Sequence, residues 1–418
     1  MRKYLLSIVL CILIILLSAP CGSSYLRLPK TSNLIKEWEI DLTQDDENAL
    51  KYLQPIEIAE NPERKEIYIN CIGKILCINP ENGKILKKYS PEENMLFFDF
   101  ILDNSFLYIS STPKDEESDL KPYVKKINTE KNETVWKTDL PFDLWGCYLT
   151  LYLSDDKLLV TDKYRFCILE TEGGKILENF EYLPHVMEYL FNSSYLIKDS
   201  SLYIFVENWQ DILKIQLPSM VLSSQKVHVE QKLSTANYEL AFIGVIGSDC
   251  FLFSLRNQLF LVDENGKIVS TLKMEDQNIR FPMYRVSNGT SNYMNPAIYG
   301  DYVFGQGDKS ICLMNFVNGE SYQKNSENFL NISLPCFYSD KLFLLNKLSN
   351  RNSEIMVLNI PDLEIVSSIR EDVFNWSEIK IRESLFPLSS PFLIMEGEKS
   401  VNLIVALRSK ICLYKVSG

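Results

Sequence analysis

The chain has very few of the residue types on which most catalytic sites depend. It contains only two histidines, His185 and His228, in 418 residues, and we interpret both as incidental. The ten cysteines include no CxxC pair and form no cluster with histidine, so zinc and dithiol redox sites have no sequence signal. No Gly-rich phosphate loop, HExxH or GxSxG motif occurs. The sequence therefore predicts a protein without catalytic activity, bound metal or cofactor.

An excess of positive charge is also lacking. Lysine and arginine number 43 against 55 aspartates and glutamates, which gives a formal net charge of -12. Binding to nucleic acid depends on a basic surface that neutralises phosphates, and no such stripe is present. We therefore expect no nucleic-acid partner. The hydrophobic content of 46% and the absence of low-complexity segments are typical of a globular protein.

Long hydrophobic runs are missing except at the N-terminus. Arg2 and Lys3 precede an apolar run and then small residues, which is the layout of an export signal. The run is shorter than the about 20 residues that cross a bilayer. We expect an export signal over residues 1–23 and a linker over 24–34, with an uncleaved signal anchor as the alternative. The protein is then exported, to the periplasm, a membrane-anchored position or the cell surface.

Cys21 offers a more specific interpretation of this N-terminus. The stretch Cys21-Gly22-Ser23-Ser24 after an apolar run resembles a bacterial lipoprotein signal, in which the cysteine is lipidated. Pro20 departs from that pattern, because such signals have a small residue directly before the cysteine. Cys21 is therefore a candidate for lipidation, and plain cleavage near Gly22 or Ser23 is the alternative.

The rest of the chain is built from a repeated unit. The stretch "CINPENGKIL" has counterparts along the sequence, and the copies begin 39 to 61 residues apart, a spacing typical of propellers and solenoids. The copies begin at Glu66, Phe106, Lys157, Ser201, Cys250, Tyr302, Lys341 and Asn402. Each copy predicts three strands, from period-2 patterning between Asn, Asp and Gly turns.

A further strand precedes most copies and ends in an acidic turn. The aspartates of these turns are Asp103, Asp156, Asp199, Asp249, Asp301 and Asp340. Aspartate suits a turn because its carboxylate can accept hydrogen bonds from nearby backbone N–H groups. Four antiparallel strands per unit form one propeller blade. The sequence therefore predicts an all-β fold, a single β-propeller domain over residues 35–418.

The two ends of the chain predict how the ring closes. The last copy stops after its third strand, and the segment 35–42 has no partners of its own. Its Trp38-x-x-Asp41-Leu42 matches Trp136-x-x-Asp139-Leu140, in the fourth strand of the second unit. We predict that residues 35–42 complete the last blade, which removes an open sheet edge. Eight blades follow, with seven as the alternative count.

Four cysteines occupy one equivalent position of the repeat, and we expect them to be small buried residues. They are Cys77, Cys167, Cys312 and Cys412, each inside an apolar strand. The disulfide state of Cys71, Cys147, Cys250 and Cys336 stays open at this point.

The hairpin signature of the units resembles the pyrroloquinoline-quinone-type propeller repeat, over nearly all of residues 35–418. The resemblance rests on Asn79…Asn82-Gly83-Lys84, Glu170…Gly173-Gly174-Lys175, Asp263…Asn265-Gly266-Lys267 and Asn315…Asn318-Gly319-Glu320. Exported members of this family include quinone-dependent alcohol dehydrogenases and the non-enzymatic outer-membrane-assembly lipoprotein. The enzymes hold their quinone against a disulfide of adjacent cysteines and a calcium ion. No two cysteines are adjacent here, so the resemblance implies a non-enzymatic member.

The connections on one face of the predicted ring vary in length, and they point to a function in binding. That face carries aromatic and arginine side chains of the types enriched at interfaces, namely Trp145, Trp209, Tyr284, Arg285 and Trp376. We expect a monomeric interaction scaffold whose partner is another envelope or secreted protein. It meets a membrane only through the N-terminal lipid or anchor. The alternative is an enzyme or sensor that binds a quinone or another small molecule in the central channel.

Overall fold

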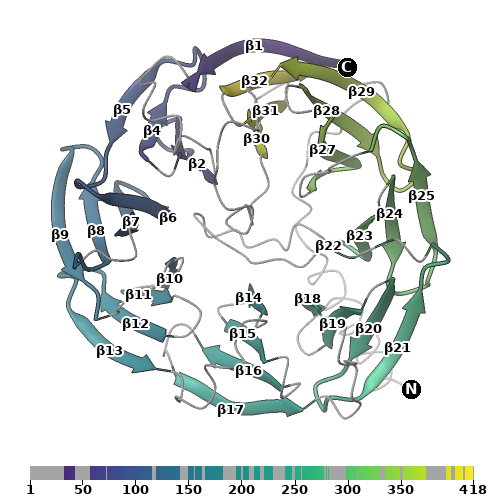
Figure 1. Cartoon of the computed structure of the whole chain (residues 1–418), viewed down its shortest axis with the longest axis horizontal. Helices are drawn as coiled ribbons and strands as arrows, with labels where there is room; N and C mark the ends of the chain where they lie inside the picture. Colours follow the sequence, from purple (N-terminus) through teal and green to yellow (C-terminus); the bar gives the residue numbers. More distant parts are fainter. Residues whose placement is uncertain are drawn as a thin grey trace, which may run out of the picture.

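The computed structural model describes most of the repeated region. The described residues are 33–42, 57–71, 73–114, 119–141, 149–154, 156–161, 165–181, 194–198, 201–206, 211–216, 221–228, 241–246, 250–255, 257–276, 279, 281, 298–307, 309–329, 335–348, 352–372, 392–396, 401–407 and 410–417. Over these residues the elements are β-strands, arranged in eight four-stranded antiparallel sheets. The sheets stand around a ring as the blades of a propeller (Figure 1).

Blades 1 to 4 follow one another along the chain. Blade 1 contains β2 (Glu57–Asn61), β3 (Glu66–Asn70), β4 (Ile75–Ile78) and β5 (Ile85–Tyr89). Blade 2 contains β6 (Met95–Asp103), β7 (Phe106–Pro113), β8 (Tyr123–Asn128) and β9 (Glu133–Asp139). Blade 3 contains β10 (Thr150–Ser154), β11 (Lys157–Thr161), β12 (Arg165–Glu170) and β13 (Ile176–Glu181). Blade 4 contains β14 (Ser194–Lys198), β15 (Ser201–Val206), β16 (Asp211–Gln216) and β17 (Val221–His228).

Blades 5 to 8 complete the ring. Blade 5 contains β18 (Ala241–Ile246), β19 (Cys250–Leu255), β20 (Gln258–Val262) and β21 (Ile268–Lys273). Blade 6 contains β22 (Ile298–Tyr299), β23 (Tyr302–Gln306), β24 (Ser310–Asn315) and β25 (Ser321–Asn325). Blade 7 contains β26 (Cys336–Tyr338), β27 (Lys341–Lys347), β28 (Asn352–Asn359) and β29 (Ile365–Asp372). Blade 8 contains β30 (Phe392–Glu396), β31 (Val401–Ala406), β32 (Lys410–Ser417) and β1 (Asn33–Asp41).

The predicted closure of the ring by the N-terminal strand is confirmed. β1 is the outermost strand of blade 8 and pairs antiparallel with β32, from Asn33 opposite Ser417 to Asp41 opposite Lys410. Figure 1 shows β1 along the rim between β5 and β29. The strand begins two residues before the predicted segment, and it joins the first part of the repeat region to the last. The β-propeller prediction is therefore correct, with the larger of the two predicted blade counts over the described residues.

The hydrophobic core lies mainly between neighbouring blades. One buried cluster joins Tyr68 and Cys77 of blade 1 to Phe97 and Phe100 of blade 2. Another joins the closing blade to blade 1 through Ile404, Ile411, Ile67 and Ile69. Blades 1, 2, 6, 7 and 8 thus bury both of their faces, which explains why the first three strands of these units read as nearly continuous apolar runs.

Two tryptophans on outermost strands connect their blade to the next one by hydrogen bonds. Trp38 of β1 donates a hydrogen bond from Nε1 to the Pro80 carbonyl in the β4–β5 hairpin (2.8 Å). Trp136 of β9 donates in the same way to the Thr171 carbonyl in the β12–β13 hairpin (3.0 Å). The sequence match between these two tryptophans therefore reflects one shared structural role.

Glycine is required where these tryptophans meet the hairpins. Gly83 and Gly174 have φ values of 71° and 70°, in the left-handed region that favours glycine. A Cβ atom on Gly174 would lie 2.6 Å from Trp136 Cδ2, and one on Gly83 would lie 2.9 Å from Trp38 Cδ2. The tryptophan rings thus occupy the space that a side chain would need.

We expect Gly174→Ala to destabilise the fold by about 3 kcal/mol, from left-handed strain together with an overpacked tryptophan. Gly300→Ala is the matched control, because Gly300 has a φ of 55° but nothing within 4 Å of its Cβ position. That control should cost only about 1 kcal/mol, the strain alone. Guanidinium unfolding measures both, and equal losses would contradict a role for the tryptophan contact.

Candidate functional site

The residues predicted from sequence to bind a partner or a lipid lie outside the described part of the chain. These are Trp145, Trp209, Tyr284, Arg285, Trp376 and the lipidation candidate Cys21. Of the two histidines, His228 is the last residue of β17, and His185 also lies outside the described residues. No helix in the described part is long and apolar enough to cross a membrane.

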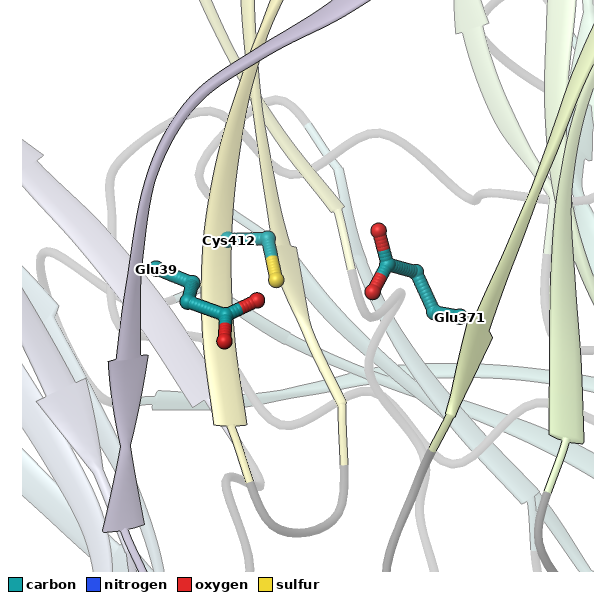
Figure 2. Close-up of side chains that lie close together, drawn as sticks. All are labelled: Glu39, Glu371 and Cys412. Carbon is teal, nitrogen blue, oxygen red and sulfur yellow. The ribbon is translucent and has the colours of Figure 1, made fainter.

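The densest group of charged and nucleophilic side chains in the described residues lies where the ring closes. Glu39 on β1, Glu371 on β29 and Cys412 on β32 bring two carboxylates and a thiol within 4.8 Å of one another. Figure 2 shows the two carboxylates pointing toward each other, with the Cys412 thiol between them. These three residues together with Lys36, Lys410 and Tyr414 are called the closure cluster.

Glu371 is the centre of the closure cluster. Its side chain is only 4% exposed, and it lies 2.7 Å from Lys36 Nζ. Lys410 Nζ also donates to this carboxylate, and so does the hydroxyl of Tyr414. Glu371 belongs to blade 7, whereas its three partners belong to blade 8. The contacts therefore join the last complete blade to the blade that the N-terminus closes.

The electrostatics of the cluster favour its charged form. Burial raises the pKa of Glu371, but the hydrogen bonds from Lys36, Lys410 and Tyr414 outweigh it and hold the pKa below its usual range. The hydrogen bond from Lys36 likewise lowers the pKa of Glu39. Burial lowers the pKa of Lys36, yet the bonds to both carboxylates leave it raised. Both glutamates are thus ionised at neutral pH.

The closure cluster has metal-ligand atoms but no room for a divalent cation between its carboxylates. Lys36 Nζ lies 2.9 Å from Glu39 Oε2 and 2.7 Å from Glu371 Oε1, and Lys410 Nζ approaches both carboxylates as well. The two ammonium groups therefore take the position and supply the charge that a metal would. Burial raises the pKa of Cys412 to about 11, so this thiol is neutral beside the ion pairs. The cluster is a structural ion-pair network.

The prediction of small buried cysteines is confirmed. Cys77, Cys167, Cys312 and Cys412 lie on the third strands β4, β12, β24 and β32, and all four are fully buried free thiols. Cys71 is also buried, and Cys250 and Cys336 are partly exposed. Cys147 lies outside the described residues.

Thiol labelling is expected to separate these two groups. Burial raises the pKa of Cys77 to about 11 and that of Cys167 and Cys312 to about 12, so these thiols are neutral and shielded at pH 8. In the native protein Cys250 and Cys336 should react with a maleimide while the buried cysteines react only after unfolding. Peptide mass spectrometry measures each site, and native labelling of Cys77 or Cys412 would contradict the packing.

Comparisons with known proteins support the fold alone. No protein-family model matches the chain, and no curated protein sequence matches it. Among solved structures, it is similar to a europium-containing methanol dehydrogenase, with 8% identity, a TM-score of 0.55 and coverage of 92% of this chain and 93% of that one. It is also similar to the Dos1 propeller, with 14% identity, a TM-score of 0.52 and coverage of 91% and 95%.

A third similar structure is the dihydro-heme d1 dehydrogenase NirN in complex with DHE. It shares 11% identity over 77% of this chain and 67% of that one, with a TM-score of 0.53. These likenesses support a β-propeller fold. They include enzymes, so the fold by itself does not decide between catalysis and binding.

The quinone chemistry of the enzyme members does not fit the residues of this chain. Their cofactor rests against a disulfide of adjacent cysteines, and no two cysteines are neighbours anywhere in this sequence. The described cysteines of the repeat are instead single buried thiols in the blade cores.

Proposed function

We propose that this chain is an exported, non-catalytic β-propeller that acts as a protein-interaction scaffold in the cell envelope. The observation that carries the proposal is the unequal length of the connections on the two faces of the ring. The hairpins between third and fourth strands are short, as at residues 79–84, 171–175 and 360–364. The connections on the opposite face include residues 182–193, 274–297 and 373–391.

A rigid ring with long connections on one face offers a surface on which a partner can bind. Loops carry function when a rigid scaffold holds their ends, and here both ends of each long connection are fixed in four-stranded sheets. The predicted interface residues Trp145, Trp209, Tyr284, Arg285 and Trp376 all fall in connections on this face. We name it the long-loop face and assign it the partner, another envelope or secreted protein.

The proposal is tested with photo-crosslinking residues introduced singly into the full chain in its natural host. Substitution at Trp145, Trp209 or Trp376 should crosslink the same envelope protein, because these positions share one face. The matched control is Lys175, an exposed residue of a hairpin on the opposite face, where that crosslink should be absent. Equal capture from Lys175, or no common protein from the three loop positions, would overturn the scaffold proposal.

The non-catalytic part of the proposal has its own test. The purified chain is incubated with pyrroloquinoline quinone, Ca²⁺, a primary alcohol and an artificial electron acceptor. We expect acceptor reduction no faster than with the heat-denatured chain. Reduction above that control would favour the alternative of an enzyme that uses the central channel.

A further inference from the structure

The structure fixes the face of the ring at which the N-terminal segment enters. β1 is a fourth strand, and its first residue, Asn33, pairs with Ser417 at the end of the third strand β32. In the other blades this edge holds the hairpin between third and fourth strands, for example the turn from β4 to β5. Residues 1–32 therefore precede β1 at the edge that carries these short hairpins. We call it the hairpin face, opposite the long-loop face.

A ring of exposed aliphatic side chains follows the rim of the hairpin face. Seven of the eight large exposed hydrophobic residues in the described chain lie in the first three residues of an outermost strand or in the hairpin before it. They are 39% to 69% exposed and occur once each in blades 8, 1, 2, 3, 5, 6 and 7: Ile35, Leu86, Val135, Leu177, Val269, Val317 and Ile365. This set is called the aliphatic ring.

In blades 1, 2, 3 and 5 a recurring β-bulge explains why an aliphatic residue is exposed there, whereas Ile35 and Ile365 have cross-strand partners and Val317 lies in a hairpin. Ile85 pairs with Ile78 and Lys87 pairs with Cys77, so Leu86 has no partner residue across the strand pair. The same break in register occurs at Leu177 and at Val269. A bulge inserts one unpaired residue and redirects its side chain. The aliphatic ring is therefore a repeated geometric feature, whereas single exposed aliphatics elsewhere need no explanation.

Four hairpins of this face share one turn geometry, and in blade 5 the turn is one residue tighter because Gly266 donates to the Asp263 carbonyl. Gly83 donates to the Asn79 carbonyl, Gly174 to Glu170 and Gly319 to Asn315, at distances of 2.9 to 3.0 Å. Blade 7 repeats the turn with Leu363 donating to Asn359. Turns of equal size on blades of equal strand order end at a similar height, so the aliphatic ring suits a planar partner that meets many blades at once.

We propose that the hairpin face lies against a lipid bilayer, with the aliphatic ring entering its interfacial region. This inference rests on the proposed export with the apolar segment 4–19 retained as an uncleaved anchor, which joins β1 through residues 20–32. A linker of that length reaches at most about 45 Å, which keeps this face near any membrane that holds the segment. The long-loop face then points away from the bilayer, toward the partner.

The charges of the hairpin face indicate which lipid it meets. Three hairpins each contain one glutamate and one lysine: Glu81 and Lys84, Glu172 and Lys175, and Glu264 and Lys267. The turns between first and second strands add aspartates such as Asp103 and Asp340. A face without net positive charge gains nothing from anionic headgroups. Contact therefore depends on apolar burial and is expected on zwitterionic phosphatidylcholine.

The test uses the full chain recovered from the membrane fraction and reconstituted in phosphatidylcholine vesicles. A photo-crosslinking residue replaces Leu86, Leu177 or Val269, and mass spectrometry counts lipid adducts on vesicles purified by flotation. Leu120 is the matched control: it is 46% exposed but lies in the connection between β7 and β8, on the long-loop face. We expect at least about ten-fold more lipid adduct at the three ring positions than at Leu120.

Three results would overturn the inference: equal lipid labelling at Leu120, crosslinks from the ring to a second copy of the chain, or no flotation with vesicles. Added anionic lipid should leave the labelling unchanged or reduce it, and a strong increase would contradict the assigned chemistry. The scaffold proposal has a different readout. It fails if Trp145, Trp209 and Trp376 give no common protein crosslink, even when lipid labelling at the aliphatic ring persists.

Discussion

Deleting residues 33–42 is expected to lower the midpoint of thermal unfolding by about 6 °C or more, or to prevent folding. The deletion removes the whole partner strand of β32 and takes Trp38, Ile40 and Leu42 out of the core shared by blades 8 and 1. Each buried apolar side chain contributes about 1.5–3 kcal/mol, so the loss exceeds about 5 kcal/mol before the ion pairs of Lys36 are included. For a domain of about 380 residues, with an unfolding entropy of about 0.8 kcal/mol/K, that corresponds to about 6 °C.

The control for this deletion removes residues 24–32, which shortens the chain by a similar length and leaves β1 in place. Its unfolding midpoint should match that of the unmodified chain. Adding a synthetic peptide of residues 33–42 to the deleted protein should restore part of the lost stability, since β32 offers a free edge, whereas a scrambled peptide should not. Calorimetry measures each case, and an unchanged midpoint after the deletion would show that the ring does not depend on β1.

The closure of the ring could be predicted from sequence because it repeats a pattern found elsewhere in the chain. Trp38 and Trp136 occupy the same position of a fourth strand, and both dock on a glycine hairpin of the next blade. The hairpins themselves were visible as Asn-Gly and Gly-Gly pairs, which suit the left-handed φ of Gly83 and Gly174. Repetition thus converts a weak local signal into a prediction of topology.

The closure cluster could not be predicted, because its central ion pair joins residues 335 positions apart. Glu371 is the second-last residue of β29, whose charged end resembles those of other strands, and nothing local indicates that it is buried. The aliphatic ring was missed for a different reason. Alternation assigns Leu86 and Leu177 to a face by counting in steps of two, and a bulge shifts that count by one residue. The closure cluster depends on which strands of neighbouring blades pack together, and the aliphatic ring depends on the register between paired strands.

Replacing Glu371 by alanine is expected to destabilise the fold by about 3–5 kcal/mol at pH 7, the cost of breaking a buried ion pair. The substitution leaves Lys36 and Lys410 side by side without their shared carboxylate and removes the acceptor of the Tyr414 hydroxyl. Glu39→Gln is the control, since its carboxylate is 45% exposed and its ion pair should be worth less than about 1 kcal/mol. Guanidinium unfolding of both variants measures the difference, and equal losses would contradict the buried role.

The same network predicts that the free energy of unfolding falls at acid pH. The pKa of Glu371 is lower in the folded chain than its ordinary value of 4.5, so below that value the unfolded chain binds more protons. Its contribution is complete above about pH 4.5 and is lost as the pH falls through the folded pKa. The unmodified chain should therefore lose stability below this pH, and Glu371→Ala should lose less over the same range. Parallel slopes from pH 5 to 3 would assign the acid sensitivity to other carboxyls.

A double substitution separates two roles of the closure cluster: its contribution to stability and its selection of the strand that closes the ring. Changing Glu371 and Lys36 together to methionine removes both members of the blade 7–blade 8 pair but leaves Lys410 beside Tyr414. If the Lys36–Glu371 pair acts only by stabilising the fold, the double variant should have a lower free energy of unfolding than the unmodified chain. Buried ion pairs are often replaced by apolar residues without loss of stability. A double variant that keeps its stability but forms mixed oligomers would show that the pair acts in specificity. The charges would then select β1 of the same chain as the strand that closes the ring.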